Sequence, residues 1–167
     1  SLGDTHMPKL VIGAHYDVYG DSLGINDNGV AIALLIHFTL ELQRLNKDVQ
    51  VEIVFFDKEE SGAIGSHDYI KKHRETIKEA IILDIIGYGE EILLSGRMSK
   101  SMYMQLEHGA KELGNSLPSD NVMFERSDIP VTLFTAAAKE DIYTDYDGFY
   151  QVSPFASFYK TMHNGNM

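Results

Sequence analysis

Imidazole and carboxylate side chains follow several short apolar runs of the sequence, at the points where those runs end. Both groups bind divalent metal ions, whereas the absence of cysteine excludes thiolate ligands, thiolate nucleophiles and disulfides. The candidate ligands are His15, Asp27, Glu60, Asp84 and His163. Their three carboxylates would carry −3 against +4 for two zinc ions, and a bound hydroxide would bring the sum to zero. The residue types therefore predict a site for two zinc ions, with cobalt or manganese as substitutes.

Each candidate ligand also has an ordinary structural explanation. A single histidine such as His15 after a strand is more often a surface or core residue, and Asp27 would suit a turn or a helix cap. Asp84 is harder to explain in this way, because it lies inside the apolar run 80–86 with no Lys or Arg within five residues. A buried carboxylate without a partner is strongly destabilising, so Asp84 requires a cation or hydrogen-bond donors from elsewhere in the chain.

Two further carboxylates suit supporting roles in a hydrolytic site. Glu59 precedes Glu60 and would be directed elsewhere, so it could take a proton from a water molecule between the metals. Asp17 lies two residues after His15 and would point the same way along an extended segment, where it could accept a hydrogen bond from the second imidazole nitrogen. We therefore expect Glu59 to act as the general base and Asp17 to orient His15.

The segments around these residues alternate between short β-branched apolar runs and longer helical patterns. Strands are predicted over residues 9–14, 49–56, 80–86, 92–95 and 131–135. Helices are predicted over residues 29–42, 62–73 and 99–113, and a last helix is predicted to begin near Ser153 with Pro154 in its first turn. The first helix has Asn26 or Asn28 as a cap and is apolar almost all round, which predicts packing on both sides. This order predicts an α/β fold, a three-layer sandwich with helices on both faces of a mostly parallel mixed sheet, and ligands of such sheets bind at the carboxyl ends of the strands.

The chain of 167 residues carries 14 Lys and Arg against 25 Asp and Glu, a formal net charge of −11. This charge has the wrong sign for holding a nucleic-acid backbone, so nucleic acid is not expected as a partner. No apolar run approaches the ~20 residues that span a membrane, and the N-terminal segment lacks the basic start and apolar stretch of a signal peptide. The sequence therefore predicts a soluble protein without a membrane partner, with the cytoplasm slightly favoured over secretion, and leaves the oligomeric state open.

Motifs of other enzyme classes are absent from the sequence. The turn after the first predicted strand lacks G-x-G-x-x-G, and no G-x-x-x-x-G-K-[ST] occurs, which argues against nucleotide binding. Ser66 and Ser127 do not stand in a G-x-S-x-G sequence, which argues against a serine hydrolase. Metal-assisted hydrolysis is therefore the chemistry that the sequence favours.

The order and spacing of these residues resemble those of the co-catalytic zinc exopeptidases, which include bacterial leucine-type aminopeptidases, aminopeptidase Y and the glutamate carboxypeptidases. The resemblance runs from about Lys9 to the C-terminus. It is carried, in order, by His15-x-Asp17, Asn26-Asp27-Asn28-Gly29, Asp57-x-Glu59-Glu60-x-Gly62 with Gly65-Ser66, Leu83-Asp84-x-Ile86-Gly87, Ser127-Asp128 and His163. One such element alone is a weak signal, whereas the ordered set is specific.

The resemblance implies a role for each candidate ligand. His15 and Asp84 would hold one zinc ion, Glu60 and His163 would hold the other, and Asp27 would bridge both. The peptide bond after Asp27 would be cis.

The same resemblance implies features around the metals. Glu59 would be the general base and later the general acid. Asp17 would contact a metal ligand and not the metal itself, and Ser127-Asp128 would lie on a loop on the substrate side. Relatives usually carry further strands and a helix before the first ligand and a helix after the last. Residues 1–167 are therefore expected to form a single catalytic domain, trimmed or minimal at both ends.

The predicted function is a zinc-dependent metallopeptidase that removes N-terminal residues from peptides through a water activated by two zinc ions. A carboxypeptidase would need an arginine for the substrate carboxylate; Arg44 and Arg74 are predicted at helix ends, whereas Arg97 and Arg126 remain available. A free N-terminal ammonium group needs acceptors instead, which the acidic residues supply. The alternatives are a carboxypeptidase or a mono-zinc glutaminyl cyclase of the same superfamily, and a metal-poor binding or scaffold domain, against which the intact ligand set argues.

Overall fold

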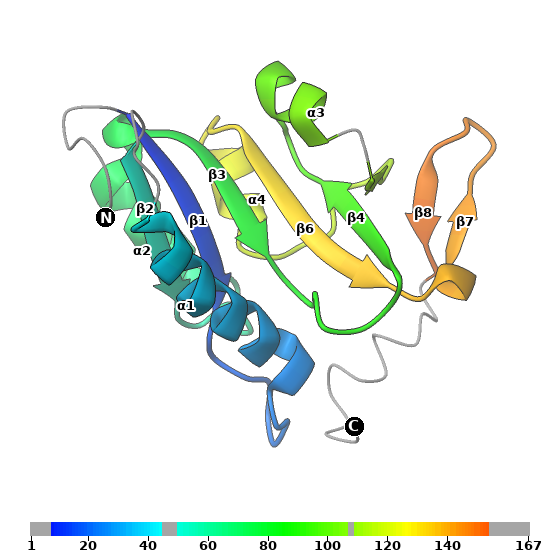
Figure 1. The fold of residues 1–167 in the computed structure, drawn as a ribbon, viewed down its shortest axis with the longest axis horizontal. Helices are drawn as coiled ribbons and strands as arrows, with labels where there is room; N and C mark the ends of the chain where they lie inside the picture. Colours follow the sequence, from blue (N-terminus) through cyan, green and yellow to red (C-terminus); the bar gives the residue numbers. More distant parts are fainter. Residues whose placement is uncertain (1–7, 45–49, 107–108, 154–167) are drawn as a thin grey trace.

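A six-stranded mixed sheet forms the centre of the structure, a computed structural model that describes residues 8–44, 50–106 and 109–153 (Figure 1). The strands are β1 (Lys9–His15), β2 (Gln50–Phe56), β3 (Ile77–Leu83), β4 (Glu91–Ser95), β5 (Lys111–Glu112) and β6 (Val131–Ala137). Their order across the sheet is β2-β1-β3-β6-β4-β5. The first four strands in this order run parallel, β4 runs antiparallel to β6, and β5 is parallel to β4. The mostly parallel mixed sheet is therefore confirmed.

Helices cover both faces of this sheet. Helix α1 (Val30–Leu42) packs on one face, and α2 (Ile64–His73) and α4 (Asn121–Arg126) pack on the other, while α3 (Lys100–Leu106) lies near β4 (Figure 1). Because successive strand residues point to opposite faces, Val11 joins the core under α2 and α4, whereas Ile12 joins the core under α1. The predicted three-layer α/β architecture is thus confirmed.

Helix α1 is buried on one side only. Leu35 and Leu42 face the sheet, whereas Leu34, Ile36 and Leu40 remain 47%, 53% and 54% exposed. The prediction that this helix packs on both sides is therefore wrong, because in the described part of the chain only the sheet covers it. None of the helices in the described residues has the length and apolar character needed to cross a lipid bilayer.

The segments after residue 99 differ most from the sequence prediction. The predicted helix 99–113 is helical only over α3, since Lys111 and Glu112 form β5 by pairing with Leu93 and Leu94 of β4. Residues Tyr150–Val152 form β8, which pairs antiparallel with β7 (Ile142–Thr144), and the last predicted helix, expected to begin near Ser153, falls on residues from 154 onward, which lie outside the described residues. Pairing with neighbouring strands here outweighs the local helical pattern.

Candidate metal centre

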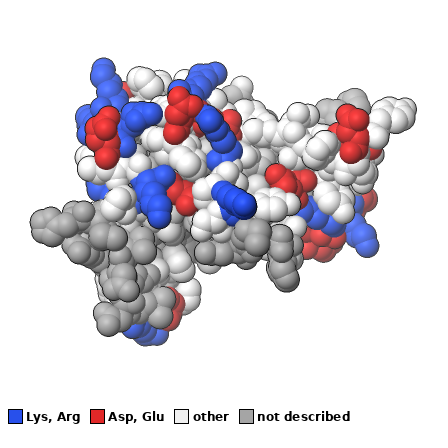
Figure 2. Space-filling view, turned by 90° about the horizontal axis from the view of Figure 1, so that it is seen from above, with Lys and Arg blue, Asp and Glu red and all other residues white. Residues whose placement is uncertain are grey.

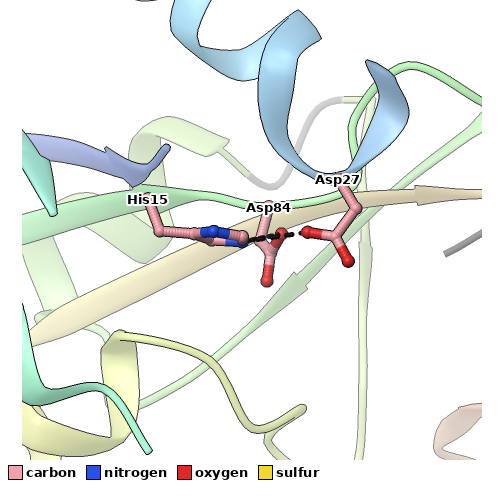
Figure 3. A group of neighbouring side chains, drawn as sticks. All are labelled: His15, Asp27 and Asp84. Carbon is pink, nitrogen blue, oxygen red and sulfur yellow. Dashed lines mark ion pairs between the residues drawn. The ribbon is translucent and has the colours of Figure 1, made fainter. Parts of the chain in front are cut away.

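Three of the five predicted ligands, His15, Asp27 and Asp84, meet at the carboxyl end of the parallel strands (Figure 3). His15 is the last residue of β1, and Asp84 directly follows β3, the parallel neighbour of β1. Asp27 reaches them from the short turn Ile25–Gly29 that leads into α1. Each of the three buried residues offers one ligand atom, and these atoms lie within 4.8 Å of one another. His163 lies outside the described residues.

The position of Asp84 differs from the predicted strand 80–86. β3 ends at Leu83, so Asp84 lies just beyond the strand, and its main-chain N–H donates to the carbonyl oxygen of Phe134 at 3.0 Å. The next residue, Ile85, has a φ of +52°, which a β-branched residue rarely adopts. The carbonyl oxygen of Ile85 still accepts the N–H of Ala136 in β6 at 3.1 Å, so Asp84 lies where the chain begins to leave the sheet, at the end where β1 also stops.

The three side chains form a buried acidic cluster around one imidazole. His15 Nε2 lies 2.9 Å from Asp27 Oδ1 and 3.4 Å from Asp84 Oδ1. His15 Nε2 and Asp84 Oδ1 are buried and make no hydrogen bond of acceptable geometry to the residues that the structure describes. Burial alone would lower the pKa of His15, but the carboxylates of Asp27 and then Asp84 raise it to about 12. The cluster thus requires a positive charge, and a divalent cation fits the donor set of one imidazole nitrogen and two carboxylates, with zinc, cobalt and manganese as suitable ions.

Two asparagines hold Asp27 in place. Asn28 Nδ2 donates to the carbonyl oxygen of Leu83 at 2.9 Å, and Asn26 Oδ1 accepts the N–H of Gly87 at 2.8 Å. The predicted capping of α1 by one of these asparagines is therefore wrong, because α1 begins after Gly29 without a side-chain cap. The Asp27–Asn28 peptide bond is cis, as the sequence resemblance implied.

Glu59 and Glu60 lie in the turn between β2 and α2, next to the end of β1. Burial, followed by the charge of Asp84, raises the pKa of Glu59 to about 8. Burial, followed by the charge of Asp27, raises the pKa of Glu60 to about 7. Within the described part of the chain, Glu60 Oε1 is buried without a hydrogen-bond partner, yet Glu60 is not one of the three residues whose ligand atoms cluster within 4.8 Å. Both glutamates therefore interact electrostatically with the cluster from outside it.

Asp17 connects the end of β1 to this turn. Its main-chain oxygen lies 3.1 Å from His15 Nδ1, and its carboxylate Oδ1 lies 3.4 Å from the same nitrogen. The carboxylate also accepts hydrogen bonds from the main-chain N–H groups of Glu59 at 3.0 Å and Glu60 at 3.2 Å. The second set of contacts was not expected from the sequence, because spacing along the chain does not reveal it.

A further carboxylate near the cluster, Asp120, was also missed. Asp120 is completely buried at the start of α4, and neither carboxylate oxygen has a hydrogen-bond partner among the described residues. Burial raises its pKa to about 6, although the nearby Ser66 of α2 partly offsets this, and the charges of His15 and Asp84 also act on it. Asp120 follows no predicted strand and is one of 25 acidic residues, so no sequence signal distinguished it.

Ser127 and Asp128 lie at the end of the parallel strands opposite to the candidate ligands. They closely precede β6 and so lie at its amino end, whereas the candidate ligands lie at the carboxyl ends of the parallel strands. Asp128 pairs with Arg97 at 2.6 Å, and the carbonyl oxygen of Ser127 accepts a hydrogen bond from Arg74 at 2.6 Å. On the side of the molecule where the parallel strands begin, Lys and Arg side chains are interspersed with Asp and Glu (Figure 2). The expected place of Ser127-Asp128 on the substrate side is therefore wrong.

Residues 2–158 match the model of peptidase family M28, and the chain belongs to this family. It is similar to Aminopeptidase YwaD of Bacillus subtilis (strain 168), with 28% identity over 86 residues that cover 49% of this chain and 19% of that protein. It is also similar to an aminopeptidase of Pseudomonas aeruginosa (strain UCBPP-PA14), with 29% identity over 82 residues that cover 47% of this chain and 15% of that protein. The matched stretch is thus under a fifth of either relative.

Solved structures share the fold. BSAP, a zinc aminopeptidase from Bacillus subtilis, superposes with a TM-score of 0.72 at 20% identity, covering 89% of this chain and 42% of that chain. The aminopeptidase from Aneurinibacillus sp. strain AM-1 gives a TM-score of 0.72 at 19% identity, covering 93% of this chain and 39% of that chain. The match spans less than half the length of either structure. The family match together with this shared fold confirms the resemblance to the zinc exopeptidases.

Proposed function

We propose that this chain contains the catalytic site of a zinc-dependent aminopeptidase, which hydrolyses the first peptide bond of a peptide with a free N-terminus. The observation that carries the proposal is the convergence of His15, Asp27 and Asp84 in a buried cluster, where two facing atoms lack hydrogen bonds. Membership of a peptidase family supports peptide hydrolysis, and the matched curated relatives are named aminopeptidases.

Each site residue would have a separate task. His15, Asp27 and Asp84 would hold the metal ion, which when bound polarises the scissile carbonyl and lowers the pKa of water. A carboxylate oxygen of Glu59 would take a proton from the attacking water and then pass it to the nitrogen of the leaving amine. Burial, the largest cause of the raised pKa of Glu59, brings that pKa toward neutrality, and such a group suits both steps because it binds and releases a proton near neutral pH.

A second zinc ion belongs to the same proposal. Glu60, whose Oε1 lacks a hydrogen-bond partner, would hold it together with His163, and Asp27 would bridge the two ions. Metal analysis of protein purified without chelators tests the stoichiometry. Two zinc ions per chain would support the two-metal site, whereas one would favour the mono-zinc glutaminyl cyclase and none would favour a binding domain.

The arginines favour attack from the N-terminus. Arg74 and Arg97 make their contacts near the amino ends of the parallel strands, and Arg44 pairs with a glutamate of α1. Arg126 lies in the last turn of α4, whereas Asp120 near the cluster precedes its first turn. The carboxylates around the metal centre would instead accept the hydrogen bonds of a substrate ammonium group.

Matched peptides test the direction of attack. One peptide is acetylated at its N-terminus and the other is amidated at its C-terminus, and both are incubated with zinc-loaded protein. An aminopeptidase should cleave only the amidated peptide. Cleavage of the acetylated peptide alone would instead indicate a carboxypeptidase, and pyroglutamate formation on an N-terminal glutamine would indicate the cyclase.

A further inference from the structure

The carboxylate of Asp17 binds two consecutive main-chain amides. The N–H of Glu59 donates to Oδ1 at 3.0 Å, and the N–H of Glu60 donates to Oδ2 at 3.2 Å, so each oxygen takes one hydrogen bond. Successive main-chain amides form a favourable site for an anion. Hydrogen bonds to an ionised acceptor are about twice as strong as those between neutral groups, and the Asp17 side chain is only 18% exposed.

The turn that receives these bonds has an unfavourable backbone. Lys58 and Ala63, on either side of the two glutamates, have φ angles of +58° and +56°, which non-glycine residues rarely adopt. Within the turn, the carbonyl oxygen of Glu59 accepts the N–H groups of Gly62 at 2.8 Å and Ala63 at 2.9 Å. These internal bonds use the carbonyl of Glu59, whereas the N–H groups of Glu59 and Glu60 are held by Asp17.

We propose that Asp17 is a positioning residue for the Glu59–Glu60 turn, and that its two main-chain bonds fix these glutamates relative to the metal centre. The main-chain oxygen of Asp17 lies 3.1 Å from His15 Nδ1 and survives any substitution of the side chain, whereas the carboxylate Oδ1 lies farther away at 3.4 Å, so a side-chain variant leaves His15 its nearer partner. The inference rests on the proposed function, in which Glu59 moves the proton, and adds the residue that directs it.

Asp17→Asn tests the proposal in the zinc-loaded enzyme. The asparagine keeps one acceptor oxygen but presents an NH2 group to the other amide, so one of the two bonds is lost. We expect unchanged zinc content, a kcat lower by about 10–100-fold and a KM within about threefold of wild type. The matched control is Asp57→Asn, since the exposed Asp57 accepts the N–H of Lys58 at 3.0 Å in the same turn, and it should change none of these. Loss of zinc in Asp17→Asn with unchanged kcat per bound zinc would overturn the proposal, because Asp17 would then act through His15.

Amide hydrogen exchange, followed by NMR, provides a readout that does not depend on activity. In the wild-type protein, the amides of Glu59 and Glu60 should exchange at least about tenfold more slowly than that of the exposed Ser61, and Asp17→Asn should remove this protection. Exchange of the Glu59 and Glu60 amides as fast as that of Ser61 in the wild type would overturn the proposal. If Asp17→Asn does not fold, this wild-type comparison alone decides between the two outcomes. If the protein cleaves no peptide but its Glu59 and Glu60 amides are protected in the wild type and unprotected in Asp17→Asn, the proposed function is contradicted. The positioning role of Asp17 is then still supported.

Discussion

The side chain of Asn28 donates a hydrogen bond from Nδ2 to the main-chain oxygen of Leu83 at 2.9 Å. Asn28 follows Asp27, and Leu83 precedes Asp84, so this bond joins the two segments that carry both carboxylates of the cluster. Asn28 is almost completely buried, which shields the bond from competing water. A neutral amide thus holds together two segments whose carboxylates repel each other.

Asn28→Ala should loosen the cluster. The substitution leaves the buried carbonyl of Leu83 without this donor, which should lower the free energy of unfolding by about 1–3 kcal/mol and weaken zinc binding by about 10–100-fold. Urea unfolding of metal-free protein and zinc titration against a competing chelator measure the two effects. Asn115→Ala is the control, because the exposed Asn115 donates to the side chain of Gln151 at 3.2 Å, away from the metal centre. Equal losses in both variants would show that the Asn28 bond has no special role.

Removal of metal should destabilise the protein through His15. A ligand at one hundred times its Kd stabilises the folded state by about 2.7 kcal/mol, so chelation should lower Tm and added zinc should restore it. His15→Ala should abolish this response in differential scanning fluorimetry. His67→Ala, at an exposed position of α2, should keep it. A zinc response that persists in His15→Ala would place the metal elsewhere.

Glu59→Gln should separate metal binding from catalysis. The amide keeps the size of the side chain but does not take up the proton, so kcat should fall by about 10²–10⁴-fold while zinc content stays at the wild-type level. Steady-state assays together with metal analysis of the same samples provide the test. Glu75→Gln, at an exposed position after α2, should retain full activity. A kcat of Glu59→Gln equal to that of wild type would exclude Glu59 as the base.

Asp120 should make the stability of the metal-free protein depend on pH. Its pKa is about 6 in the folded state against an ordinary value of 3.8, so the folded state holds the proton more tightly. The stabilising contribution of the protonated form is therefore full below pH 3.8 and is lost as the pH rises through 6. Asp120→Asn cannot ionise, and it should raise the free energy of unfolding at pH 7 by up to about 3 kcal/mol with little change at pH 4.

Urea unfolding in the presence of a chelator, repeated between pH 4 and pH 7, measures this difference for Asp120→Asn. The control variant is Asp128→Asn, in which the exposed partner of Arg97 at the other end of the strands is replaced, and it should not reproduce the gain in stability at pH 7. If Asp120→Asn changed the free energy of unfolding by the same amount at every pH, Asp120 would not titrate between pH 4 and pH 7.

The sequence by itself determined the central strands and the residue types of the metal centre. β1 and β6, which lie inside the sheet, were predicted because strands buried on both faces must be apolar on both, which leaves a continuous signal in the sequence. His15, Asp27 and Asp84 were identified by residue type and by order along the chain. The two-residue strand β5 left no such signal, because its stability comes from pairing with β4.

Only the tertiary structure decided which side chains contact one another. Parallel pairing of β1 and β3 brings His15 and Asp84 together at the carboxyl ends of these strands, although 69 positions separate them in the sequence (84 − 15). The same folding sends the carboxylate of Asp17 to the amides of Glu59 and Glu60, and it buries Asp120 without hydrogen bonds. Hydrogen bonds, burial and shifted pKa values depend on distances in space, and the spacing of residues along the chain does not encode those distances.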